Sequence, residues 1–381
     1  MTHSAPPNQP RATMSAPTAG PTVRPRPAVA ALPRYSRAAG LSQVRWRASS
    51  NESTVPPSPR VQEAIARAAA CTHLYPSLQG DLLIADLSAR LQLAPEQIVV
   101  GGGSLALLQH ALGAYTGSGS EVVYAWRSYE AYPILIGVVG ATPVPVALDS
   151  THTHDVDAML AAITWATQAI IVCNPNNPTG TELSRSEIER LITSVPANVL
   201  VLLDEAYQEF ATTAVDGISL VRQYPNVVAF RTFSKAYGLA GLRAGYMIAH
   251  PDVADNVRAA TPPFGLSLLA EAGARAAWSD TTHTDHIVDV VCQGREYLRR
   301  EAARRGLDTP VSGANFVWFP VGPRTAELQR ACVAHGVSVR AFDGEGVRVT
   351  VGEREAEDAV LAAIDSLHLS TTDSELSPLV H

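Results

Sequence analysis

Lysine is almost absent from this chain of 381 residues. Lysine and arginine together number 29, yet Lys235 is the single lysine, and the other 28 are arginines. A primary amine can lose its proton and condense with a carbonyl group, whereas a guanidinium group stays protonated. The low count has two possible explanations. Either Lys235 performs covalent chemistry, or it is the one lysine left by chance after a general replacement of lysine by arginine. It does not by itself decide between the two.

Cysteines are few, and long apolar runs are missing. The four cysteines are scattered without a Cys-x-x-Cys pair, so we expect no disulfide framework, no metal site and a reducing, cytoplasmic location. No uncharged apolar run approaches the length of about 20 residues that a membrane-spanning helix needs, so we expect no membrane association. The net charge of −7, without a basic run, argues against a nucleic-acid partner.

Acidic residues are missing from the first 50 positions, where proline and alanine are frequent. Such a segment buries too little apolar surface to order itself. An acid-poor, arginine-bearing start is also typical of an organelle transit peptide, but frequent proline disfavours the amphipathic helix that a transit peptide requires. We therefore expect a disordered leader over residues 1–43, and a flexible polar tail over residues 370–381.

The rest of the chain alternates between apolar strands and amphipathic helices. Strands are predicted at 97–100, 122–124, 143–148, 169–173, 199–203, 227–230 and 244–249. Helices are predicted at 58–70, 81–93, 105–115, 129–139, 156–166 and 185–194. Several strands are continuously apolar, which is typical of strands buried on both faces of a parallel sheet. The fold class is therefore α/β.

Polar or glycine-rich segments follow four of these strands. Ligands of parallel sheets bind beyond the carboxyl ends of the strands, so the four segments are predicted to form one site. They are Gly101-Gly-Gly-Ser104, Asn174-Pro-Asn-Asn-Pro-Thr-Gly180, Asp204-Glu-Ala-Tyr207 and Arg231-Thr-Phe-Ser-Lys235.

The motifs NPNNPTG, DEAY and SKAYGLAGLR, in this order, resemble the class I/II aminotransferases of pyridoxal-phosphate fold type I. The similarity is strongest to the histidinol-phosphate and aromatic amino acid branch, and it extends from about residue 44 to about residue 365. It implies a homodimer with shared active sites. It also implies a segment 44–70 that packs with the small domain, a large domain 71–262 with a mainly parallel seven-stranded sheet, and a smaller α/β domain 263–369.

The resemblance implies that Lys235 holds pyridoxal 5′-phosphate as an internal aldimine and then moves a proton from the substrate Cα to C4′ of the cofactor. Asp204 would pair with the pyridine nitrogen, and Asn177 and Tyr207 with the ring oxygen. A helix cap at Asp204 and a plain turn at Asn177 are the alternatives. The other cofactor-binding residues implied are Gly103, Ser104, Tyr129, Thr232, Ser234, Arg243 and, from a second subunit, Tyr75.

At the substrate end, the alternation of residues 347–352 places Arg348 and Thr350 on one face of a strand. The resemblance implies that Arg348 binds the α-carboxylate of the substrate and that Asn315 lies near this carboxylate. It also matches Arg340 to an arginine that binds the substrate's phosphate in histidinol-phosphate enzymes. Those enzymes follow Asn-Glu with an aromatic-Gly-Pro-Ser run. Here Asn51, which the resemblance counts among the substrate-binding residues, and Glu52 are followed by Ser-Thr-Val-Pro. The runs Tyr-Ala-Trp-Arg-Ser-Tyr-Glu-Ala-Tyr-Pro and Val-Arg-Ala-Phe-Asp-Gly-Glu-Gly-Val-Arg look more like the aromatic aminotransferase subgroup, so aromatic substrates are favoured.

The leading hypothesis is an aminotransferase that moves an amino group between an L-amino acid, preferably aromatic, and a 2-oxo acid through a ping-pong pyridoxamine-phosphate form. A histidinol-phosphate aminotransferase and a pathway-specific aminotransferase are alternatives. A pyridoxal-phosphate-dependent decarboxylase is another, because sequence does not show which bond to Cα breaks. An aminotransferase-like regulator is disfavoured, because the first 44 residues are too short and proline-rich for a DNA-binding module.

Overall fold

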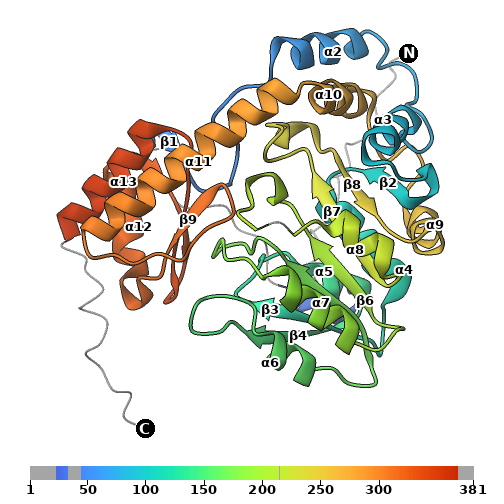
Figure 1. Cartoon of the computed structure of the whole chain (residues 1–381), viewed down its shortest axis with the longest axis horizontal. Coiled ribbons are helices and arrows are strands. Elements are labelled where there is room, and N and C mark those ends of the chain that lie inside the picture. Colours follow the sequence, from blue (N-terminus) through green and yellow to red (C-terminus); the bar gives the residue numbers. More distant parts are fainter. Residues whose placement is uncertain (1–22, 33–43, 214, 368–381) are drawn as a thin grey trace, which may run out of the picture.

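The computed structural model describes residues 23–32, 44–213 and 215–367 (Figure 1). The predicted tail 370–381 and most of the predicted leader 1–43 lie outside these residues. The described part of the leader contains the short helix α1 (Pro27–Ala30), which packs against α5 (Tyr132–Val139). Leu32 contacts the same helix at Gly137, where an added Cβ would come within 2.6 Å of the leucine side chain.

A seven-stranded sheet forms the larger part of the molecule. Its strand order is β2-β8-β7-β6-β5-β3-β4, and only β8 runs antiparallel to its neighbours among the described strands. This confirms the predicted fold class. The strands are β2 (Ile98–Gly101), β3 (Glu121–Trp126), β4 (Thr142–Ala147), β5 (Thr167–Cys173), β6 (Leu200–Asp204), β7 (Val227–Thr232) and β8 (Gly245–Ile248).

Helices cover both faces of this sheet (Figure 1). Successive residues of a strand point to opposite faces, so Val201 and Leu203 of β6 enter one hydrophobic core while Leu200 and Leu202 enter the other. The first core is closed by α3 (Asp81–Leu91), α6 (Val156–Ala161), α7 (Arg185–Ser194) and α8 (Gly217–Gln223). The second is closed by α4 (Ser104–Tyr115), α5 and α9 (Pro251–Ala260).

Two predicted helices differ from the structure. The helix expected at 129–139 begins only at Tyr132, because Pro133 favours the first turn of a helix. Residues 127–131 instead form the loop that follows β3. The helix expected at 156–166 ends at Ala161, since side-chain hydrogen bonds of Thr164 and Thr167 to the backbone hold a turn there.

A smaller part contains a three-stranded antiparallel sheet in the order β11-β12-β9, packed with helices (Figure 1). Near the N-terminus, β1 (Trp46–Arg47) pairs with β10 (Val337–Ser338) of this part. The other elements are β9 (Phe316–Phe319), β11 (Arg340–Phe342), β12 (Gly346–Thr350), α11 (Thr281–Arg304), α12 (Thr325–Ala334), α13 (Arg354–Leu367) and the 3-10 turns Pro95–Gln97, Gln208–Phe210, Ala240–Leu242 and Gly322–Arg324.

The predicted domain boundaries stay a prediction. Helix α10 (Leu268–Ser279), which falls in the predicted small domain 263–369, packs on α2 (Pro59–Ala69) and α3. The capped helix predicted at 58–70 is confirmed as α2, where Ser58 Oγ accepts a hydrogen bond from the backbone N–H of Val61.

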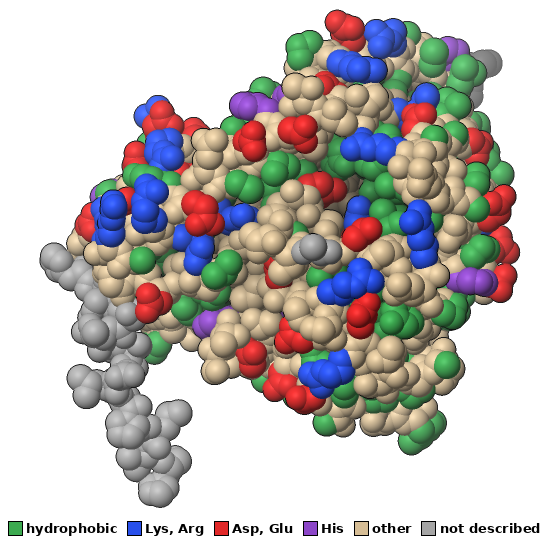
Figure 2. All heavy atoms as spheres, viewed as in Figure 1, with side chains coloured by type: hydrophobic (Ala, Val, Ile, Leu, Met, Phe, Trp, Pro, Cys, Tyr) green, Lys and Arg blue, Asp and Glu red, His purple; other side chains and the backbone are tan. Residues whose placement is uncertain are grey.

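Acidic and basic side chains lie interspersed on the face of the molecule seen in Figure 2. Within the described ranges, no helix combines the length and the apolar character that a bilayer crossing requires.

Candidate active site

A cavity of about 330 Å³ lies at the carboxyl ends of the sheet strands, between the two parts of the molecule. Twelve of the predicted site residues line it, and these are Asn51, Ser104, Tyr129, Asn177, Asp204, Tyr207, Thr232, Ser234, Lys235, Arg243, Arg340 and Arg348. The prediction that four strand ends build one site therefore agrees with the geometry.

Lys235 lies in the loop after β7, where its Nζ donates a hydrogen bond to the carbonyl oxygen of Asn51 at 3.0 Å. Removal from water lowers the pKa of this amine to about 7, and the guanidinium group of Arg348 acts in the same direction. The carboxylate of Glu52 opposes this lowering. A substantial fraction of the amine is therefore neutral near pH 7, as nucleophilic chemistry requires.

Asp204 ends β6 on the floor of the cavity. Its Oδ2 accepts a hydrogen bond from the Tyr132 hydroxyl at 2.7 Å, and its Oδ1 accepts one from the backbone N–H of Ala206 at 3.1 Å. Burial raises the pKa of the carboxyl group, while these two donors and the ammonium group of Lys235 lower it. A cationic partner in the cavity would stabilise the carboxylate further.

The opposite end of the cavity offers donors suited to an anion. Ser104 begins α4, so backbone N–H groups and the positive end of the helix dipole face this end. Arg243 Nη1 donates to Ser234 Oγ at 3.2 Å, and Thr232 Oγ1 donates to Ser234 Oγ at 2.9 Å. At Gly103 an added Cβ would lie 2.5 Å from Arg243 Nη2, so a side chain there would fill this cradle.

Asn177 and Tyr207 lie between the floor and the smaller part. Asn177 Oδ1 accepts a hydrogen bond from Arg348 Nη1 at 2.5 Å, and the Tyr207 hydroxyl accepts one from Asn51 Nδ2 at 2.8 Å. Burial raises the pKa of Tyr207, so this phenol stays protonated and can donate. Both side chains are thus held in place by residues from distant parts of the chain.

At the substrate end, Arg348 and Thr350 of β12 face the same side, as predicted. Arg348 Nη2 donates to the carbonyl oxygen of Ser49 at 2.6 Å, and Thr350 Oγ1 donates to Asn51 Oδ1 at 3.0 Å. Asn315 does not line the cavity but lies directly behind it, where its Nδ2 donates to the Asn51 carbonyl oxygen at 3.2 Å.

Tyr75 does not line the cavity either, and nor does Gly103, which precedes the lining residue Ser104. The side chain of Tyr75 is 82% exposed and stacks on Phe264 with a ring-centroid distance of 4.8 Å. Leu74, Leu78 and Leu82 are also exposed nearby in sequence.

Sequence reasoning missed several residues of the site. Tyr132 contacts Asp204, and Glu130 pairs with Arg340, but neither contact joins residues close in sequence. The spacing Tyr129-Glu-Ala-Tyr132 could have indicated these contacts only if the loop before α5 had already been known. Neither Tyr132 nor Glu130 lines the cavity. The lining residues that were not predicted are Ser49, Ser50, Glu52, Leu105, Cys173, Ala206 and Ala240.

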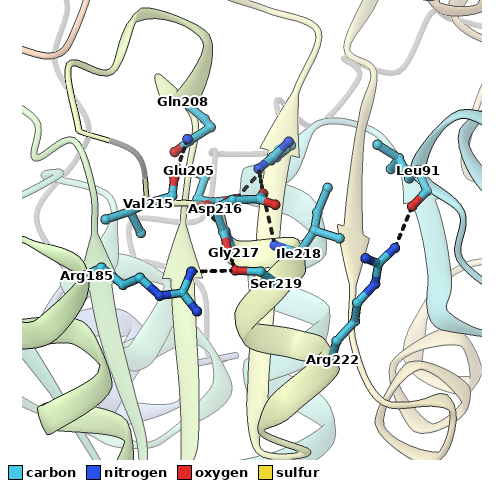
Figure 3. A network of polar contacts seen from close by, with 11 residues as sticks. Leu91, Arg185, Glu205, Gln208, Val215, Asp216, Gly217, Ile218, Ser219 and Arg222 are labelled. Atoms are coloured by element: carbon cyan, nitrogen blue, oxygen red, sulfur yellow. Dashed lines mark hydrogen bonds and ion pairs between the residues drawn. The ribbon is translucent and has the colours of Figure 1, made fainter.

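A buried polar network fixes the two strand ends that bear Asp204 and Lys235. Glu205 Oε2 accepts a hydrogen bond from Arg231 Nε at 2.9 Å, and Glu205 Oε1 accepts one from the backbone N–H of Gly217 at 2.7 Å (Figure 3). Arg231 Nη2 also donates to Asp216 Oδ1 at 2.8 Å. Glu205 follows Asp204 directly, so the network ties β6, β7 and the start of α8 together.

The residues present fit pyridoxal 5′-phosphate. A carboxylate suited to a pyridinium nitrogen, an amine with a low pKa and an anion cradle surround one cavity. The absence of a Cβ at Gly103 lets the guanidinium group of Arg243 lie close to the start of α4, because an added Cβ would be 2.5 Å from Nη2.

Comparison with known proteins identifies the class of enzyme to which the chain belongs. The family described as aminotransferase class I and II matches residues 47–364, and the chain belongs to this family. The chain is therefore an aminotransferase with the fold of the pyridoxal-phosphate enzymes of fold type I.

Individual relatives and solved structures show which aminotransferases the chain resembles. The chain is 46% identical over 327 residues to an aromatic amino acid aminotransferase from Streptomyces avermitilis, which covers 85% of this chain and 91% of that protein. An aromatic amino acid aminotransferase from Rhodococcus jostii is 46% identical over 314 residues, covering 82% and 88% of the two chains. The crystal structure of a histidinol-phosphate aminotransferase from Sinorhizobium meliloti, in complex with pyridoxal 5′-phosphate, superposes with a TM-score of 0.83 at 29% identity, covering 90% of this chain and 98% of the other.

Proposed function

We propose that this aminotransferase moves amino groups between aromatic L-amino acids and 2-oxo acids, on pyridoxal 5′-phosphate bound covalently to Lys235. The observation that supports this most directly is the amine of Lys235, whose pKa is about 7, in one cavity with Asp204 and an anion cradle. When bound, the cofactor supplies an electron sink for the negative charge that develops at the substrate Cα.

Residues of the chain would position the ring of the cofactor. Asp204 would keep the ring nitrogen protonated, and the tyrosine behind it, Tyr132, would hold the carboxylate in position. Since Asn177 Oδ1 accepts from Arg348, the amide nitrogen of Asn177 is the group that would donate to the ring oxygen, beside the Tyr207 hydroxyl. Tyr129 would pack on the ring.

Gly103, Ser104, Thr232, Ser234 and Arg243 would hold the phosphate group. This set places a helix start and a guanidinium group at the same end of the cavity. Once released from the cofactor, the Lys235 amine would take the proton from the substrate Cα and return it at C4′ of the cofactor.

Arg348 would bind the substrate α-carboxylate through two parallel hydrogen bonds, with Asn51 and Asn315 behind it. The preference for an aromatic side chain is supported by the two relatives named as aromatic amino acid aminotransferases. The ion pair between Arg340 and Glu130 also supports this preference. A phosphorylated substrate would need Arg340 as a partner for its phosphate, and Glu130 already binds this arginine.

We further propose that the enzyme works as a homodimer in which Tyr75 of one subunit reaches the phosphate site of the other. The exposed, stacked rings of Tyr75 and Phe264 support this arrangement. Tyr75→Phe should keep the dimer mass and weaken cofactor affinity, as measured by ultracentrifugation and absorbance titration. A monomeric wild-type protein that binds the cofactor with full affinity would contradict the proposal.

The function is tested with the purified holoenzyme. Phenylalanine with 2-oxoglutarate should give phenylpyruvate and glutamate in equal amounts, with a higher kcat/KM than histidinol phosphate as donor. Release of carbon dioxide without dependence on a 2-oxo acid would instead show decarboxylation. Lys235→Ala serves as the inactive control.

A further inference from the structure

Arg340 lines the cavity, and its side chain meets that of Glu130, which is not itself a lining residue. Glu130 lies in the loop between β3 and α5, directly after Tyr129, and Arg340 begins β11 in the smaller part. Arg340 Nη2 donates to Glu130 Oε1 at 2.8 Å and to Oε2 at 2.7 Å, and Arg340 Nε donates to Oε2 at 3.1 Å. This two-pronged pair fixes both side chains and joins the two parts of the molecule.

Three arginines line the cavity, and two of them, Arg348 and Arg340, have acceptors of different charge. Arg348 donates to the amide oxygen of Asn177 and to the carbonyl oxygen of Ser49, which are both neutral acceptors. Arg340 instead faces a carboxylate, so the charge of the guanidinium group is compensated within the protein.

Because the ion pair is largely buried, the charge of Glu130 has a strong electrostatic effect on a ligand beside it. The side chain of Arg340 is 12% exposed and that of Glu130 is 27% exposed, so solvent screens the pair only in part. An uncharged aromatic side chain can enter beside the pair without electrostatic cost. A phosphate group would bring a dianion next to the Glu130 carboxylate and would have to compete with it for Arg340, and such like-charge contacts reject a ligand strongly.

We propose that Glu130 is a specificity-determining residue, which occupies Arg340 and thereby excludes phosphorylated amino donors in favour of donors with uncharged side chains. This inference rests on the proposed transamination of aromatic amino acids and names the residue that sets its substrate class. Glu130 acts through charge and through its hold on Arg340, not on the reacting atoms.

The test compares holoenzymes of the wild type and of Glu130→Gln, which preserves the shape of the side chain and removes its charge. The ratio of kcat/KM for histidinol phosphate to kcat/KM for phenylalanine should rise about tenfold or more, mainly through a lower KM for the phosphorylated donor. Adding Arg340→Gln to Glu130→Gln should abolish the gain.

Glu345→Gln is the matched control. Glu345 forms an ion pair with Arg127 in the same region, and neither of these residues lines the cavity, whereas Arg340, the partner of Glu130, does. Removing its charge should leave the substrate ratio unchanged, so a rise seen with both glutamine variants would reflect a general loss of negative charge and would overturn the proposal.

An unchanged ratio in Glu130→Gln, an equal loss for both donors, or a gain that survives the removal of Arg340 would also overturn it. Calorimetric titration of each holoenzyme with histidinol phosphate, without a 2-oxo acid, gives a binding constant that requires no turnover. If phenylalanine is not transaminated by the wild type while Glu130→Gln still binds histidinol phosphate more tightly, the proposed function fails and the role of Glu130 stands.

Discussion

Arg231→Met removes the cation that compensates Glu205 beneath the strand ends of the active site. The exposed fractions are 11% for the Arg231 side chain and 1% for that of Glu205, so the carboxylate cannot turn to solvent. Methionine fills a similar volume without charge. The backbone N–H of Gly217 remains as a donor to Glu205, and an added Cβ at Gly217 would lie 2.7 Å from the carboxyl group, so this part of the site has no room to rearrange.

Leaving one partner of a buried pair uncompensated costs about 3–5 kcal/mol of stability. The sign of the pH dependence follows from the pKa values. Burial raises the pKa of Glu205 above its ordinary value of 4.5, and Arg231 opposes the rise. Arg231 also lowers the pKa of the buried Glu209, which burial brings to about 7. Without Arg231 both carboxyl groups bind protons more tightly in the folded protein than in the unfolded chain. The free energy of unfolding must then fall as the pH rises from about 4.5 through the folded pKa values.

Urea unfolding of the holoenzyme, followed by fluorescence at pH 5.5 and pH 8, measures the effect. Arg231→Met should be less stable than the wild type at both pH values, with the larger deficit at pH 8, and adding Glu205→Gln should recover part of the loss. The same substitution at Arg190, whose side chain is 46% exposed and pairs with an exposed aspartate, should cost less than about 1 kcal/mol. A deficit at Arg231 no greater than at Arg190, or one that grows as the pH falls, would refute the reasoning.

Three further substitutions test the site itself. Lys235→Arg should fold as the wild type does by circular dichroism yet lose activity by about a hundredfold to ten-thousandfold or more, and wild-type turnover would contradict the role of the amine. Gly103→Ala places a Cβ 2.5 Å from Arg243 at a φ of +99°, so cofactor affinity measured by absorbance titration should fall, whereas unchanged affinity would place the phosphate elsewhere. Tyr132→Phe removes the 2.7 Å hydrogen bond to Asp204, so kcat should fall while KM changes little; a change in KM alone would assign Tyr132 to substrate binding.

The strand ends of the site could be predicted from the sequence because the physical rule is local. A continuously apolar run such as residues 199–203 predicts a buried parallel strand, and the residue that follows it, Asp204, must lie at the carboxyl edge of the sheet. The same rule places Lys235 and Asn177 at that edge. The structure brings all three to one cavity.

Contacts between distant segments could not be predicted in this way. The hydrogen bond between Tyr132 and Asp204 depends on where α5 begins, and the predicted start three residues earlier gave no reason to pair them. The ion pair between Glu130 and Arg340 spans 210 positions and depends on how the smaller part packs against the sheet. Hydrophobic periodicity specifies which face of an element is buried, but it does not specify which polar groups meet across an interface.

The central claim is that Lys235 binds the cofactor covalently, and the composition of the chain permits a direct measurement. Because the chain has a single lysine, borohydride reduction after incubation with pyridoxal 5′-phosphate can label only Lys235 or the N-terminal amine. Peptide mass spectrometry should find one reduced pyridoxyl group per chain, on Lys235, formed increasingly as the pH rises through about 7, where the amine loses its proton. Label found mainly on the N-terminal amine, or no label at Lys235, would contradict the account.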